Sequence, residues 1–177
     1  MGRTRLPGKV REAQILGVAL RSFRERGFKG TSMSEIAENV GISKAGLYHH
    51  FRSKDELLCA LFEPSFGRVE ELLKRRPGQK ELLEGYLEIM LAERDLATLL
   101  ATDLSVRTRP GVGEKVVELM RRLREQVAGE GADLKQMIRA DGALWVLRSA
   151  VISFPEADEQ TVREVALPAA AAVLNLP

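Results

Sequence analysis

Apolar residues recur every three to four positions along most of the chain, which is the spacing of one face of an α-helix. The first such stretch runs from Gly8 to Arg26, and Gly27 supplies a stop signal after it. The same period predicts five helices in the later part of the chain: Gln79–Ala92, Leu96–Leu104, Val112–Ala128, Leu134–Ser153 and Glu159–Leu176. Pro168 removes a backbone hydrogen bond within the last of these, so we expect a kink or break there. No stretch alternates convincingly with period two, and the pattern therefore predicts an all-α protein.

Serines are placed to cap the helices that lie between these stretches. Ser32 and Ser53 are each followed three residues later by glutamate, which is the capping-box spacing, and Ser43 can cap a short helix after a break at Gly41. The helices that these caps predict cover residues 33–40, 44–50 and 54–76.

The segment from residue 33 to residue 51 has the spacing of a helix-turn-helix. Ala37 lies four residues before Gly41, so a small side chain allows two helices to cross closely and the glycine allows the turn between them. If Leu47 faces the core, Ala45 and His49 point to the opposite side of the third helix. Such a helix can enter the major groove of DNA with its first turn toward the base edges.

The distribution of charge agrees with this interpretation without proving it. The net charge is only +2, but residues 1–62 hold 11 Lys and Arg against 6 Asp and Glu, while residues 63–177 hold 16 against 19. A basic head on a mildly acidic body is typical of a protein that meets a polyanion, and a chance excess of solvated charge explains it equally well on charge alone.

Residues 26–37 and 40–58 resemble the DNA-binding head of TetR-family transcriptional regulators, in the order of helices and spacers as well as in residue types. The resemblance covers roughly residues 8–62. It implies that the head is followed by a divergent helical domain that dimerises and binds a small molecule. We therefore expect a DNA-binding domain over residues 1–62 and a helical-bundle effector-binding and dimerisation domain over residues 63–177.

Carried over residue by residue, the resemblance makes several residues of the head face DNA, with Tyr48 and Lys54 as phosphate contacts. The backbone amides at the helix starts near Ser32 and Ser53 add partial positive charge where phosphates would lie, and the outward-facing Ala45 belongs to the same predicted surface. The complete predicted DNA-binding set is Thr31, Ser32, Ser43, Lys44, Ala45, Gly46, Tyr48, His49, His50 and Lys54.

These features predict a sequence-specific DNA-binding regulator, a repressor that a small apolar effector releases from double-stranded DNA at a palindromic operator. The apolar residues of the last two helices predict a homodimer. The alternative is a constitutive DNA-binding protein whose body serves only dimerisation or protein contact.

Aromatic, methionine and polar-tipped residues of the body are the candidates for an effector cavity. We expect the cavity among the helices spanning residues 82–90, 116–123 and 144–154, with Asp103 as a further polar group. The predicted ligand-binding residues are Phe62, Phe66, Tyr86, Met90, Met120, Trp145 and Arg148.

No pattern in the sequence favours catalysis, a metal site or a cofactor. The only two histidines, His49 and His50, are adjacent and point about 100° apart on a helix, which is a poor geometry for binding one metal ion. The single cysteine, Cys59, excludes an intrachain disulfide and suits a reducing compartment. No stretch approaches the length of a membrane span, so we expect a cytoplasmic protein without a membrane partner.

Overall fold

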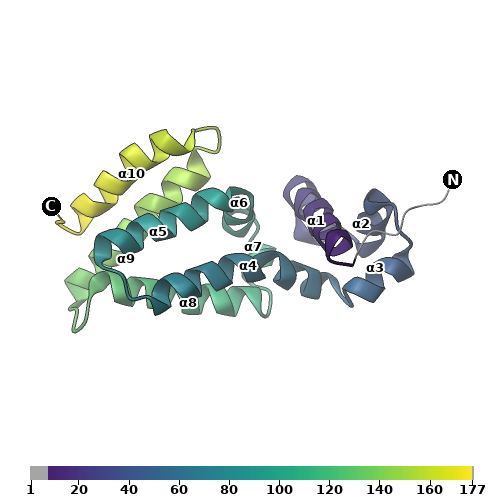
Figure 1. The fold of residues 1–177 in the computed structure, drawn as a ribbon, viewed down its shortest axis with the longest axis horizontal. Helices are drawn as coiled ribbons and strands as arrows, with labels where there is room; N and C mark the ends of the chain where they lie inside the picture. The colour runs from purple at the N-terminus through teal and green to yellow at the C-terminus, as the bar shows by residue number, and fades with distance from the viewer. Residues whose placement is uncertain (1–7, 177) are drawn as a thin grey trace.

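The computed structural model describes residues 8–176, which form ten helices and no strand (Figure 1). The helices are α1 (Gly8–Gly30), α2 (Met33–Val40), α3 (Lys44–His50), α4 (Lys54–Lys74), α5 (Gln79–Ala92), α6 (Arg94–Thr102), α7 (Leu104–Arg107), α8 (Val112–Ala128), α9 (Leu134–Ser153) and α10 (Glu159–Val173). The molecule is elongated: α1 to α3 lie at one end, α5, α9 and α10 lie at the other, and α4 runs between them (Figure 1). The all-α prediction is confirmed.

The structure can be compared with the predicted helix bounds at Gly27, Asp103 and Pro168. The first helix is interrupted at the predicted stop, because Gly27 is non-helical with φ 75°, and α1 reaches Gly30 only across the kink at this residue. The helix expected over residues 96–104 corresponds to α6, which ends at Thr102, and the Asp103 carboxylate then accepts from the backbone N–H of Ser105 and starts the separate helix α7. The expected break at Pro168 is absent, since α10 runs on to Val173.

A first hydrophobic core holds the head together and extends beyond it. Its fully buried members include Phe23, Phe28, Ile36 and Leu47 from α1 to α3, joined by Leu57 of α4. Side chains from later helices complete this core: Leu96, Leu99, Val106 and Val112. The three-helix head is therefore packed on α6, α7 and the start of α8, and the division at residues 62 and 63 remains a prediction.

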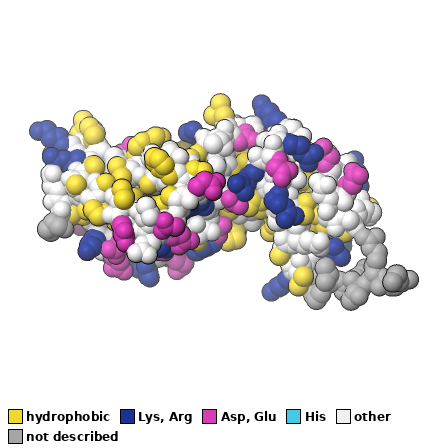
Figure 2. Space-filling model, turned by 90° about the horizontal axis from the view of Figure 1, so that it is seen from above, with side chains coloured by type: hydrophobic (Ala, Val, Ile, Leu, Met, Phe, Trp, Pro, Cys, Tyr) yellow, Lys and Arg dark blue, Asp and Glu magenta, His cyan; other side chains and the backbone are white. Residues whose placement is uncertain are grey.

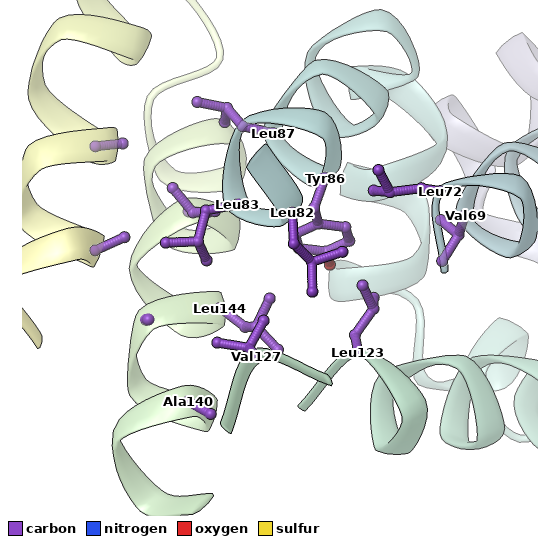
Figure 3. Packing of buried hydrophobic residues seen from close by; sticks show 14 of the residues in the cluster. Val69, Leu72, Leu82, Leu83, Tyr86, Leu87, Leu123, Val127, Ala140 and Leu144 are labelled. Atoms are coloured by element: carbon purple, nitrogen blue, oxygen red, sulfur yellow. The ribbon is translucent and has the colours of Figure 1, made fainter. Parts of the chain in front are cut away.

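A second core fills the body between α4, α5, α8, α9 and α10. Figure 3 shows Tyr86 of α5 within it, near Leu72 of α4 and Leu123 of α8. The Tyr86 hydroxyl donates to the sulfur of Met120 at 3.6 Å. Burial raises the pKa of Tyr86 to about 12, so its hydroxyl remains protonated throughout the physiological range.

Candidate nucleic-acid interface and ligand cavity

Each helix of the α2–turn–α3 unit starts at a serine cap. The Ser32 hydroxyl accepts from the Glu35 amide at 3.2 Å, and the Glu35 carboxylate accepts from the Ser32 amide at 2.7 Å, which completes the capping box. Gly41 ends α2 in the left-handed region at φ 77°, where glycine meets no steric penalty. Ser43 caps α3 by accepting from the Gly46 amide at 3.0 Å. Both caps therefore follow directly from the local sequence.

Helix α3 buries one side chain and exposes most of the others. Leu47 is fully buried, whereas Lys44, Ala45 and His49 are exposed and Tyr48 is 41% exposed. Gly46 leaves little room for a side chain, because a Cβ there would lie 3.2 Å from the Ser43 hydroxyl.

The remaining histidine of α3 has a partner within the protein. His50 is half-buried, and its Nδ1 lies 3.5 Å from the carboxylate of Glu12 on α1. The exposed positions of α3 form one surface, whose contact with DNA remains a prediction.

Two residues of the predicted DNA-binding set are engaged inside the protein. Thr31 is only 2% exposed, and its hydroxyl donates to the backbone oxygens of Ser22 and Gly27 at 3.0 Å each. Its side chain is therefore not available to phosphate, and the expectation for it is corrected.

Lys54 is the second, and its ammonium donates to the backbone oxygens of Phe28 and Thr31 at 2.7 Å each. It also lies 4.4 Å from the centre of the Phe28 ring. Desolvation and the nearby Arg109 lower the pKa of Lys54. Lys54 therefore ties the start of α4 to the end of α1, and its predicted contact with phosphate, through the third N–H of the ammonium, remains a prediction.

Asp103 links the head to the body, a role that the sequence did not indicate. Its carboxylate accepts from the backbone N–H of Phe28 at 2.7 Å and from the Ser105 hydroxyl at 2.6 Å. It does not line the apolar cavity. The expectation that Asp103 orients a ligand is therefore wrong, and the residue instead ties the turn after α6 to the end of α1.

An apolar cavity of about 90 Å³ lies between α4, α5, α6 and α8. Five of the seven predicted ligand-binding residues line it: Phe62, Phe66, Tyr86, Met90 and Met120. The other lining residues, which the sequence did not single out, are Ser65, Val69, Ile89, Glu93, Leu96, Ala97, Leu100, Val116, Leu119 and Leu123. Ser65 and Val69 follow Phe62 and Phe66 at helical spacing, and that spacing was the available signal for finding them.

The two remaining predicted residues lie elsewhere. Trp145 is 63% exposed on α9, with the guanidinium of Arg148 5.2 Å from its ring centre, and neither lines the cavity. The expected wall over residues 144–154 is therefore wrong, and α6, with Leu96, Ala97 and Leu100, takes its place. The reason is that α9 turns Leu144 and Leu147, rather than Trp145, toward the body core.

The part of the chain that the structure describes contains neither a candidate metal site nor a candidate membrane-spanning helix. No group of three or more His, Cys, Asp and Glu side chains could hold a metal ion within residues 8–176. None of the described helices combines the length and apolar character that a membrane span requires.

Comparison with known proteins shows that this chain is similar to bacterial transcriptional regulators. Residues 15–61 match the family model described as "Bacterial regulatory proteins, tetR family". The HTH-type transcriptional repressor AcnR of Corynebacterium diphtheriae is 30% identical over 118 residues, which are 67% of this chain and 62% of the repressor. The chain thus spans less than two thirds of that relative's length.

Solved structures extend the similarity from the head to nearly the whole chain. A TetR-like transcriptional regulator from Rhodococcus sp. RHA1 is 28% identical, with 97% of this chain and 99% of that one covered and a TM-score of 0.75. AibR, solved with isovaleryl coenzyme A and operator DNA, shares the fold at 21% identity, with 94% and 100% covered and a TM-score of 0.69. Residues 15–61 thus match the DNA-binding head of the tetR family of bacterial regulatory proteins, and the whole chain is similar in fold to a TetR-like transcriptional regulator.

Proposed function

We propose that this chain is a sequence-specific DNA-binding transcriptional regulator, a repressor that binds a palindromic operator as a homodimer and is released by a small apolar effector. The observation that carries the proposal is the exposed surface of α3, Lys44, Ala45, Tyr48 and His49, held on a capped helix-turn-helix. The name of the relative AcnR, a transcriptional repressor, supports the direction of regulation.

The exposed surface of α3 suits a major groove in size and chemistry. Side chains at Lys44 and His49 can reach base edges or phosphates, and the Tyr48 hydroxyl can donate to a phosphate. Small residues at Ala45 and Gly46 leave room for close approach of the helix to the bases. One short helix of the head thus carries both side chains that can contact phosphates and side chains that can reach base edges.

Large apolar side chains left exposed on α9 and α10 support the homodimer. Leu134, Ile138 and Trp145 are 63 to 75% exposed and repeat along one side of α9, and Val165 of α10 is 66% exposed. Figure 2 shows apolar side chains gathered on the body, at the end of the molecule away from the head. An apolar surface of this kind is typical of protein interfaces. A twofold axis through it would present two heads to two half-sites of DNA.

The cavity supports effector release because α4 connects it to the head. Phe62, Phe66 and Val69 of α4 line the cavity, while Leu57 and Lys54 of the same helix contact the head. A ligand that pushed the lining of α4 outward would tilt this helix and change the spacing of the two heads.

The test is gel-shift titration of the purified chain against DNA fragments selected from a random pool. We expect recovery of a palindromic site with affinity that falls steeply as salt rises, since lysine and arginine contacts displace counterions from phosphates. Salt-independent binding or recovery of no common site contradicts the proposal.

The alternative function, a constitutive DNA-binding protein, is favoured by the size of the cavity. At about 90 Å³ it is smaller than the roughly 150 Å³ that accommodates benzene in an engineered protein cavity, so an effector must displace side chains. Operator affinity that stays constant across a panel of small apolar ligands would make this the better description.

A further inference from the structure

We propose that α9 packs antiparallel against α9 of a second copy of this chain, about a twofold axis beside Trp145, and that Arg148 of each copy pairs with Asp141 of the other. This inference rests on the proposed function, because it gives the homodimer of that proposal a register and an ion pair. It depends on a basic side chain at the exposed side of α9 that has no acidic partner within residues 8–176.

Arg148 is this basic side chain. Its Nε is buried and has no hydrogen-bond partner among residues 8–176. None of the ion pairs formed within the same residues involves Arg148. Its guanidinium lies 5.2 Å from the centre of the Trp145 ring instead. A partly buried cation without an acceptor is unfavourable, so a carboxylate brought by a second copy would stabilise it.

The side of α9 that carries Trp145 is apolar except for few residues. Leu134, Ile138 and Trp145 are 63 to 75% exposed along it. At about 100° per residue, Asp141 and Arg148 are the only charged residues of α9 that lie within about 60° of Trp145. This side therefore offers a second copy an apolar surface with one acid and one base.

The spacing of the acid and the base suits a twofold axis. Asp141 precedes Trp145 by four residues and Arg148 follows it by three, and both lie toward the same edge of the exposed side. In a twofold interface, residue i of one copy faces residue j of the other, and j faces i. An axis midway between the two charges thus places each Asp141 opposite the Arg148 of the other copy, and the pair occurs twice.

The same charges disfavour the neighbouring registers. An axis one helical turn later along α9 would place Arg148 opposite its own copy, and an axis one turn earlier would do the same to Asp141. Like charges that face each other across an interface are strongly unfavourable. The two charges therefore select the register in which Trp145 lies beside the axis.

Asp141 is accessible to a second copy. Its side chain is 55% exposed, and its contact within the chain joins Oδ1 to the guanidinium of Arg124 on α8 at 3.5 Å. That contact is long for a charged pair and uses one carboxylate oxygen. Asp141 can therefore accept from a second arginine across the interface.

Charge reversal at either position tests the pair in the full chain. Asp141→Lys places two cations opposite each other, and Arg148→Glu places two anions opposite each other, in both copies of the pair. Each variant alone should have a dimer Kd at least about 10-fold higher than wild type. Analytical ultracentrifugation across micromolar concentrations measures the Kd.

An equimolar mixture of the two variants is the sharper measurement. In a mixed dimer the introduced lysine of one chain faces the introduced glutamate of the other, and the remaining Asp141 and Arg148 face each other. Native mass spectrometry, which separates the dimers by mass, should therefore show the mixed dimer in excess of both homodimers. Its formation also establishes that both variants are folded.

Two further sets of variants complete the test. Arg139→Glu is the matched control, because it reverses the charge of an exposed residue of α9 that lies about 120° from Trp145, and it should remain dimeric. Asp141→Asn and Arg148→Gln remove the pair without adding repulsion. If the two side chains pair, the double variant should weaken the dimer by less than the product of the two single effects.

The outcomes separate this ion pair from the homodimer itself. A monomeric wild type overturns both the pair and the homodimer of the proposed function. A dimeric wild type whose charge-reversal variants keep the wild-type Kd overturns the pair alone. Weakened variants that form no mixed dimer, or neutral substitutions whose effects multiply, also overturn the pair and leave the homodimer standing.

Discussion

The carboxylate of Asp103 accepts a hydrogen bond from the backbone N–H of Phe28 at 2.7 Å, across 75 residues of sequence. The contact joins the turn between α6 and α7 to the end of α1, where Gly27 has left helical geometry. The Lys54 ammonium donates to the backbone oxygens of Phe28 and Thr31 in the same region. The end of α1 is thus held by a carboxylate from the body and an ammonium from α4.

Replacing Asp103 by asparagine should destabilise the protein by about 1–3 kcal/mol, the range for loss of a hydrogen bond that leaves a buried donor unpaired. The amide can keep one acceptor, but its NH₂ group would face either the Phe28 amide or the Ser105 donors. Urea unfolding at neutral pH measures the loss. Wild-type stability of this variant would show that the contact between Asp103 and Phe28 has no energetic role.

The same contact predicts a pH dependence. Partial burial raises the pKa of Asp103, but hydrogen bonds from the Ser105 hydroxyl and the Phe28 and Ser105 amides outweigh it, so the pKa lies below its ordinary value of 3.8. A lowered folded-state pKa stabilises the protein above the unfolded value and ceases to do so as pH falls through the folded value. Wild-type stability should therefore fall below about pH 4 more steeply than that of Asp103→Asn. Parallel curves for the two proteins contradict this.

Lys54→Ala should lower the free energy of unfolding by about 1–3 kcal/mol, because two charge-assisted hydrogen bonds to backbone carbonyls are lost. The matched control is Lys44→Ala, which removes the same charge from an exposed position of the head. We expect chemical denaturation to separate the two variants, with the Lys44 variant close to wild type. Equal stabilities would make Lys54 a surface lysine rather than a link between α4 and α1.

Substitutions on α3 should divide into two classes of effect on DNA binding. Tyr48→Phe removes one phosphate donor and should weaken binding about 5- to 10-fold at every sequence, whereas His49→Ala should change which site is preferred. Gel shifts against a small panel of operator variants distinguish the two. Lys80→Ala, at an exposed lysine of α5, serves as the control and should bind like wild type.

Trp145→Glu should convert the dimer to a monomer without loss of helical content. The residue is 63% exposed in the single chain, so the charge disturbs an interface rather than the core. Val117→Glu on α8, at a position 71% exposed, is the control and should remain dimeric. Light scattering at micromolar concentration reports both masses. A monomeric wild type, or monomers in both variants, would contradict an interface through α9 and α10.

Local signals in the sequence were enough to predict α2, α3 and the bounds of α5, α8 and α9. Caps such as Ser32 and Ser43 act within three residues, and the apolar period acts within a few turns, so neither depends on distant contacts. The same local rules indicated the helix-turn-helix and the exposed side of α3. Five cavity residues were also predicted: Phe62 and Phe66 share one side of α4 and Tyr86 and Met90 share one side of α5 at helical spacing, and Met120 comes from α8.

Tertiary structure decided what each polar side chain does. Thr31 and Lys54 look like surface donors in the sequence, but Thr31 donates to backbone carbonyls of α1. Lys54 donates to the carbonyls of Phe28 and Thr31, which it reaches only because α4 packs beside α1. Asp103 meets Phe28 because α6 packs on the head core.

The position of Trp145 was decided in the same way. The period of α9 permits either side of the helix to face the core, and packing against α8 and α10 chose the side with Leu144 and left the indole exposed. Spacing within one helix determines which residues share a side. Only contacts between elements distant in sequence determine what that side meets.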